Sequence, residues 1–107
     1  MDKKEVFDIA NNYLRYLLLH NYKYEKAYVF GSYAKGTFTG DSDIDIAIVF
    51  NDLKDRFSTQ VKLLMLTTKF DTRIEPHPID KKDFNMNNPF VYEIMKSGIE
   101  MKPFTDK

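Results

Sequence analysis

Two short segments in the first half of the chain carry residues suited to phosphate and metal-ion chemistry. Gly31 and Ser32 directly follow the apolar run 27–30, and Asp43 and Asp45 come after an interval of ten residues, 33–42. A glycine lets the backbone approach a phosphate closely, and a serine hydroxyl with neighbouring N–H groups can donate hydrogen bonds to phosphate oxygens. We therefore interpret Gly31 and Ser32 as a phosphate-binding turn.

The two aspartates predict a cation beside that turn. Asp43 and Asp45 are two residues apart, so on a strand they project from one face with Cα atoms about 6.6 Å apart. Carboxylates placed in this way repel each other, and a hard, oxygen-ligated ion such as Mg²⁺ relieves the repulsion. A phosphate-binding turn beside carboxylate-held Mg²⁺ indicates nucleotidyl or phosphoryl transfer. Asp41 is interpreted as a solvated loop charge and is left out of the site.

Hydrophobic patterns predict the elements that must position these residues. The run 43–50 alternates strictly, which predicts a strand whose isoleucine face is core. The other expected elements are a helix over 2–20, a strand over 27–30, a loop with one short helical turn over 31–42, a helix over 53–70, a strand over 72–77, a helix over 89–97 and an edge segment followed by a frayed end over 99–107.

Two of these predictions depend on particular side chains. In the helix over 53–70, apolar side chains including Phe57, Val61 and Leu64 share one face, which we expect to be buried, with Asn51-Asp52 as the N-cap. The strand over 72–77 is expected to end at Pro76-His77-Pro78, because proline cannot donate to a strand ladder.

Length and composition limit the number of domains and the classes of function that are possible. The chain has 107 residues, 16 Lys+Arg against 16 Asp+Glu, and no cysteine. This length predicts a single domain over 1–107, and the lack of cysteine excludes disulfides and thiolate sites and is compatible with the cytoplasm. No apolar run approaches the ~20 residues of a membrane span. A balanced charge argues against binding long nucleic acids but not against binding a nucleotide.

The motif resembles a known signature. The residues Gly31-Ser32, ten intervening residues and Asp43-Ile44-Asp45 are similar to the signature of minimal nucleotidyltransferases, including MntA-type antitoxins, within the DNA polymerase β-like superfamily. The resemblance implies an α/β (α+β) nucleotidyltransferase fold, with a mixed β-sheet flanked by helices. It also implies two Mg²⁺ ions that bind a triphosphate, most simply ATP, while an acceptor hydroxyl attacks the α-phosphorus.

The same resemblance implies a third carboxylate from a later strand. Glu75 fits best because it lies inside the predicted strand, while Asp71 and Asp80 compete for the role from its borders. His77 is interpreted as a turn residue, although it shares a strand face with Glu75. Lys35, the loop's only cation, is either a triphosphate contact or a solvated lysine. The expected metal ligands and catalytic residues are thus Asp43, Asp45 and Glu75, and the expected nucleotide contacts are Gly31, Ser32 and Lys35.

We expect no extra domain to hold an acceptor, so a partner or a second subunit is expected to bring it. The resemblance implies an antitoxin that transfers AMP from ATP to a tyrosine of a HEPN-domain toxin. Two alternatives stay open. One is transfer to a small-molecule hydroxyl, with an acceptor pocket across the boundary of a homo-oligomer. The other is a catalytically silent binding subunit, against which the retention of both Asp43 and Asp45 argues.

Overall fold

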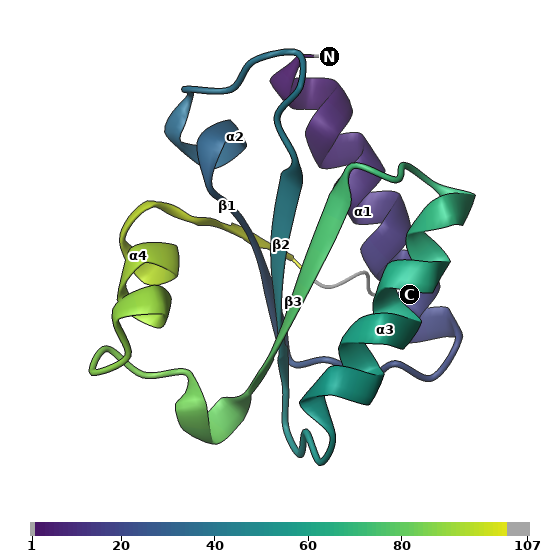
Figure 1. Cartoon of the computed structure of the whole chain (residues 1–107), viewed down its shortest axis with the longest axis vertical. Coiled ribbons are helices and arrows are strands. Elements are labelled where there is room, and N and C mark those ends of the chain that lie inside the picture. The colour runs from purple at the N-terminus through teal and green to yellow at the C-terminus, as the bar shows by residue number, and fades with distance from the viewer. Residues whose placement is uncertain (1, 103–107) are drawn as a thin grey trace.

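The computed structural model describes residues 2–102, whose four strands form one mixed sheet in the order β3-β2-β1-β4 (Figure 1). β1 is antiparallel to both β2 and β4, whereas β2 and β3 are parallel. The strands are β1 Lys26–Phe30, β2 Ile44–Phe50, β3 Ile74–Asp80 and β4 Ile99–Met101. This mixed sheet with flanking helices confirms the fold class that the resemblance implies.

Helices flank the sheet on both faces. α1 and α3 lie together on one face and α4 lies on the other, while α2 follows directly on β1 at one end of the sheet (Figure 1). Short 3₁₀ turns, η1 and η2, follow α3 and β3. The bounds are α1 Lys3–Leu19, α2 Ser32–Lys35, α3 Arg56–Leu66, η1 Thr67–Lys69, η2 Lys81–Asp83 and α4 Pro89–Ser97.

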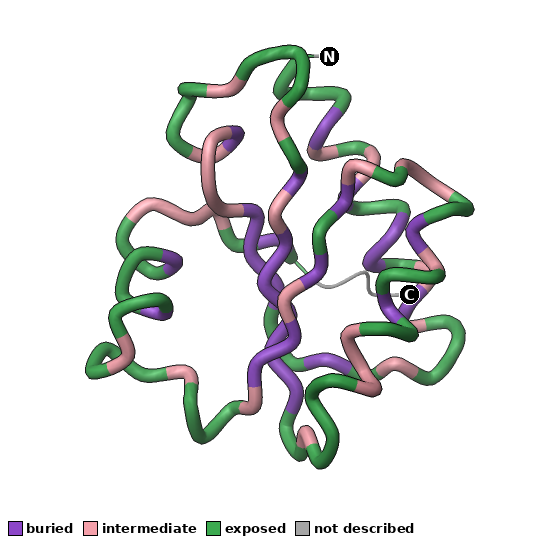
Figure 2. Tube along the Cα trace, in the orientation of Figure 1, coloured by how far each residue is buried: buried purple, intermediate pink, exposed green. Residues whose placement is uncertain are grey.

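The core lies mainly between the central strand β2 and the layer of α1 and α3. The isoleucine face of β2 is fully buried there, as its alternation predicts. The opposite face of β2 also holds buried residues, because α4 covers part of it with Ile94 against Ala47. Figure 2 shows this concentration of buried positions along the central strands. The partly buried Asp45 therefore lies on a strand that is otherwise enclosed on both faces.

α1 and α4 begin at or within one residue of the predicted starts, and a side chain caps each of them. The Asp2 carboxylate accepts from the N–H of Glu5 at 2.9 Å, and α1 begins at the next residue after Asp2. Asn88 caps α4, with Pro89 in its first turn. The edge segment forms β4, and the end expected to fray, 103–107, lies outside the described residues. Within the described range, no helix is both long and apolar enough to cross a bilayer.

The predicted end of the third strand is wrong, because β3 continues through both prolines to Asp80. β3 is an edge strand, and Pro76 and Pro78 have the same parity, so both turn their backbone toward the open edge. At this edge the carbonyl of Pro76 accepts a hydrogen bond from the side-chain amide of Gln60 at 3.4 Å. The carbonyl of Pro78 accepts one from Nε of Arg56 at 3.2 Å. The missing N–H groups therefore cost no ladder bond.

The predicted orientation and start of the second long helix are also wrong. Phe57 is 78% exposed, and Val61, Leu64 and Met65 on the same face are exposed as well, whereas Leu63 is buried. α3 begins at Arg56, with Asp55 as its N-cap, because the backbone N–H of Leu53 is held in the preceding loop by a side chain from β3. An exposed apolar stripe thus covers the outer face of α3, defined by Phe57, Val61, Leu64 and Met65.

Candidate active site

The phosphate-binding turn and the carboxylates meet because β1 and β2 pair. Phe30, the last residue of β1, is paired with Asp45, so the following Gly31 lies against the Asp45 side chain. Gly31 has a positive φ of 76°, and a Cβ built there would lie 2.5 Å from Oδ2 of Asp45. Only glycine therefore allows the turn to come this close to the carboxylate.

Ser32 and Lys35 form the two ends of α2. Ser32 is the first residue of this short helix, directly after the turn, and its side chain is partly buried. Lys35 is the last residue, and its Nζ lies 3.8 Å from a carboxylate oxygen of Glu93 on α4. Lys35 is half-exposed, so this pair is weak and leaves the ammonium group able to move to a phosphate.

Three potential ligands converge beside Gly31. Asp45 is paired across the sheet with Glu75, and His77 lies two residues further along β3. Nε2 of His77 is 3.2 Å from Oδ1 of Asp45 and 3.9 Å from Oε1 of Glu75. One ligand atom from each residue lies within 4.8 Å of the others. Among the described residues, this is the group whose spacing suits a shared cation.

His77 is the residue that the sequence interpretation missed, since it is a strand residue and not a turn residue. The sequence carries a signal for it, because Glu75 and His77 alternate onto one face, but the two prolines predict the end of the strand at this point. The imidazole is held by aromatic neighbours. Its centroid lies 5.1 Å from that of Phe30 and 5.8 Å from that of Phe90 on α4.

Asp43 lies outside this group. It is exposed, and it stands one residue before β2, on the same side of the chain as Asp45 by alternation. The competitors of Glu75 are engaged elsewhere. Asp71 accepts from Nη2 of Arg73 at 2.8 Å, and both carboxylate oxygens of Asp80 accept from backbone amides. Of the three acids considered for the third position, Glu75 is the one opposite Asp45.

The donor set fits a divalent cation. Asp45 and Glu75 offer carboxylate oxygens, which Mg²⁺ prefers, and both side chains are reachable from solvent. The imidazole of His77 adds a nitrogen ligand, and nitrogen suits ions such as Zn²⁺ or Fe²⁺ better than Mg²⁺. Oxygen donors beside a glycine turn at a helix start can hold a metal-bound polyphosphate.

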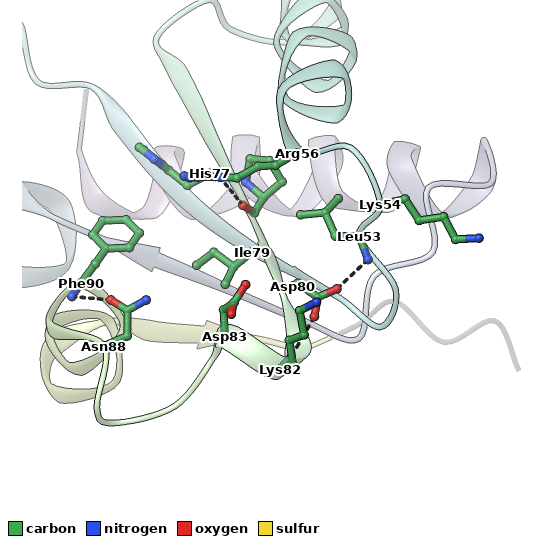
Figure 3. A pocket seen from close by; sticks show the side chains of 11 residues that line it. Leu53, Lys54, Arg56, His77, Ile79, Asp80, Lys82, Asp83, Asn88 and Phe90 are labelled. Atoms are coloured by element: carbon green, nitrogen blue, oxygen red, sulfur yellow. Dashed lines mark hydrogen bonds between the residues drawn. The ribbon is translucent and has the colours of Figure 1, made fainter.

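A pocket of about 560 Å³ adjoins this group (Figure 3). His77 is one of its lining residues, and the pocket follows β3 from there to η2. The pocket is large enough for a small ligand.

The comparison with protein families agrees with this geometry. The family model described as polymerase beta, nucleotidyltransferase matches residues 12–102, which include the turn, both aspartates and the three converging ligands. The chain belongs to this nucleotidyltransferase family. No curated protein matches it.

Three solved structures share the fold. A putative nucleotidyltransferase from Sulfolobus solfataricus is 20% identical with a TM-score of 0.70, covering 96% of this chain and 88% of that one. A toxin-antitoxin structure with AMP-PNP is 24% identical with a TM-score of 0.64, covering 89% and 74%. A mutant of the toxin-antitoxin MntA-HpeT is 18% identical with a TM-score of 0.60, covering 98% and 76%. At these identities the likeness establishes the fold.

Proposed function

We propose that this nucleotidyltransferase moves AMP from ATP to a hydroxyl of a partner protein, and that it serves as the antitoxin of a pair with a HEPN-domain toxin. The observation that carries the proposal is the contact of the Gly31 turn with Asp45, opposite Glu75. Similar solved structures include two of toxin-antitoxin systems, one of them with AMP-PNP, which supports the partner and the nucleotide.

In the proposed reaction, the turn at Gly31 and the two ends of α2, Ser32 and Lys35, hold the β- and γ-phosphates. The acceptor oxygen attacks the α-phosphorus, and an O–P bond forms. The bond from the α-phosphorus to the bridging oxygen breaks, so pyrophosphate leaves with the electron pair. The hydroxyl proton passes to the Glu75 carboxylate and then to solvent, since Glu75 is the more exposed acid of the group.

Asp43, Asp45 and Glu75, with His77 beside them, would hold the divalent cations, two Mg²⁺ ions in the proposal. Such cations neutralise phosphate charge and polarise the α-phosphate when bound. The protein positions the ligands, because the sheet fixes Asp45 and Glu75 in register and the aromatic rings fix His77. A cytoplasmic site of action completes the proposal, in line with the lack of cysteine.

The test is label transfer from α-³²P-ATP with the chain in the presence of its genomic neighbour. Asp45→Asn should abolish labelling and leave the fold intact, because an amide keeps the shape of the side chain but loses the charge that binds the cation. Glu75→Gln should lower labelling strongly, and Asp71→Asn, an acid outside the group, should leave it unchanged. Full labelling by the Asp45→Asn variant with Mg²⁺ present would refute the proposed chemistry.

A second candidate function is transfer to a small-molecule hydroxyl, which the pocket beside His77 favours. Labelling of free alcohols by the purified chain, with every co-purifying protein unlabelled, would establish it in place of protein modification. A silent binding subunit would instead show neither Mg²⁺-dependent ATP binding nor labelling.

A further inference from the structure

The two carboxylate oxygens of Asp45 face different neighbours. Oδ1 lies 3.2 Å from Nε2 of His77. Oδ2 faces the phosphate-binding turn, since a Cβ built on Gly31 would lie 2.5 Å from it. Asp45 therefore borders two positions for a cation, one beside Glu75 and His77 and one beside Gly31. The two positions differ in chemistry, because the first includes an imidazole nitrogen.

We propose that the position formed by Asp45, Glu75 and His77 binds a transition-metal dication of the zinc class before any nucleotide is present. The zinc class here means ions such as Zn²⁺ and Co²⁺, which accept an imidazole ligand readily. The position beside Gly31 then receives the Mg²⁺ that accompanies ATP. The inference rests on the proposed function, and it assigns one of the two cation positions of that function to an ion other than Mg²⁺.

The spacing of the three donors suits such an ion. Zn²⁺ binds imidazole nitrogen and carboxylate oxygen at about 2.0–2.2 Å, so neighbouring ligands of a tetrahedral site lie about 3.3–3.6 Å apart. Nε2 of His77 is 3.2 Å from Oδ1 of Asp45 and 3.9 Å from Oε1 of Glu75. The Glu75 side chain is half-exposed, so it can move to close the remaining gap. Three protein donors leave a fourth position for water or a phosphate oxygen.

The imidazole of His77 is held in place for this role. Its side chain is 18% exposed, and its ring centroid lies 5.1 Å from that of Phe30 and 5.8 Å from that of Phe90. Figure 3 shows His77 and Phe90 at the same end of the pocket. The two neighbouring rings restrain the imidazole while Nε2 faces both carboxylates. Binding an ion therefore requires little reordering of this ligand.

The same donor set suits Mg²⁺ less well. Mg²⁺ requires nearly octahedral oxygen ligands and gives up water reluctantly, whereas an imidazole nitrogen occupies part of this site. The chain has no cysteine and two histidines, so His20 is the other imidazole. The His20 ring stacks on Tyr16 with centroids 3.8 Å apart, and its Nδ1 lies 2.9 Å from the Tyr16 carbonyl oxygen. His20 is outside the group and can serve as the control.

The test is calorimetric titration of Zn²⁺ and of Mg²⁺ into the untagged chain without nucleotide. We expect one Zn²⁺ per chain, bound about a hundredfold more tightly than Mg²⁺. His77→Phe keeps a ring beside Phe30 and Phe90 but removes the nitrogen. It should weaken Zn²⁺ binding by about a hundredfold and change Mg²⁺ binding by less than about threefold. Glu75→Gln removes a charged oxygen ligand and should weaken the binding of both ions.

His20→Phe is the matched control, because it makes the same substitution at the other imidazole. It should leave the affinity for Zn²⁺ unchanged. Two spectroscopic readouts identify the ligand. Co²⁺ should give visible d–d absorption bands in wild type and in His20→Phe, and these bands should be lost in His77→Phe. In ¹⁵N NMR of the wild-type imidazoles, Zn²⁺ should shift Nε2 of His77 and leave both ring nitrogens of His20 in place.

Several results would overturn the proposal. One is Zn²⁺ binding no tighter than Mg²⁺ binding, and another is equal Zn²⁺ affinity in His77→Phe and wild type. A loss of Zn²⁺ affinity in His20→Phe as large as in His77→Phe would also overturn it. Unshifted His77 nitrogens would mean that this side chain only hydrogen-bonds Asp45. The NMR measurement uses the wild-type chain, so it decides the question even where a variant does not fold.

Failure of the proposed function would look different. In that case Mg²⁺ with a non-hydrolysable ATP analogue would not shift the amides of residues 31–35, or no label from α-³²P-ATP would reach any acceptor. The affinity for Zn²⁺ is measured without nucleotide and without an acceptor, so it depends on neither result.

Discussion

Replacing Gly31 by alanine tests the link between the turn and the carboxylate most directly. Gly31 has φ 76° and ψ −149°, a region that is almost restricted to glycine. The new Cβ would also lie 2.5 Å from Oδ2 of Asp45, closer than real contacts allow. The flexible end of Asp45 will move more readily than the backbone, so its contact with His77 should be lost.

The expected effect of Gly31→Ala has two parts, a loss of stability and a loss of transfer rate. The backbone conformation alone costs about 1–3 kcal/mol for a residue with a Cβ. For a domain of this size each kcal/mol lowers Tm by about 4 °C, so we expect a loss of about 4–12 °C. A displacement of about 1 Å at a reacting group costs on the order of 10²-fold in rate, and we expect transfer to fall by that factor.

Gly36→Ala is the matched control. Gly36 also has a positive φ, 80°, but a Cβ there meets nothing within 4 Å. Its backbone cost of about 1–2 kcal/mol should lower Tm in a similar way while Asp45 stays in place. The assay is label transfer from α-³²P-ATP at a temperature where both variants are folded by circular dichroism. Transfer by Gly31→Ala within a few-fold of Gly36→Ala would refute the reasoning.

Three further predictions concern stability. Tyr13→Phe should cost about 1 kcal/mol in urea unfolding, because the buried hydroxyl donates to the Leu63 carbonyl at 2.8 Å. Tyr33→Phe should be neutral or stabilising, since the buried Tyr33 hydroxyl has no hydrogen-bond partner in the described part of the chain; a loss as large as that of Tyr13→Phe would contradict this. The backbone N–H of Leu53 holds the pKa of Asp80 below its usual 3.8, so this carboxylate stabilises the fold above that pH and ceases to as the pH falls through the lowered value. The Tm difference between wild type and Asp80→Asn should therefore shrink on acidification, and a constant difference would contradict the assignment.

The parts of the fold that sequence predicts are those that one local pattern decides. The strict alternation of apolar residues predicts strand β2, and an N-cap residue followed by proline predicts where α4 begins. α3 is different, because Leu63 to Leu66 are four consecutive apolar residues and cover more than one face of a helix. Periodicity then cannot say which face meets the sheet, and the stripe that begins with Phe57 lies outward.

The extent of β3 is beyond local pattern for another reason. A proline is excluded from a strand only where its N–H is needed, and that depends on whether the strand is at an edge and which way each residue faces. Whether β3 is an edge strand depends on the order of all strands in the sheet. That order is known only once β2, β1 and β4 have been placed. The error hid His77, because a residue thought to be in a turn has no fixed place beside Asp45.

Gly31 shows how the same residue can be explained at two levels. The sequence gives it a role toward a phosphate, since a bare backbone can approach an anion closely. The pairing of Phe30 with Asp45 adds a second requirement, because the glycine also faces the carboxylate. Both requirements act on one position, so a mutation at Gly31 cannot separate the effect on phosphate binding from the effect on the metal ligands.

Ser32→Ala affects only phosphate binding, since it removes a hydroxyl at the helix start without entering the space of Asp45. We therefore expect Ser32→Ala to weaken Mg²⁺-dependent ATP binding while Tm and the Asp45 contact with His77 stay unchanged. Calorimetric affinity equal to wild type would mean that the phosphates are held elsewhere.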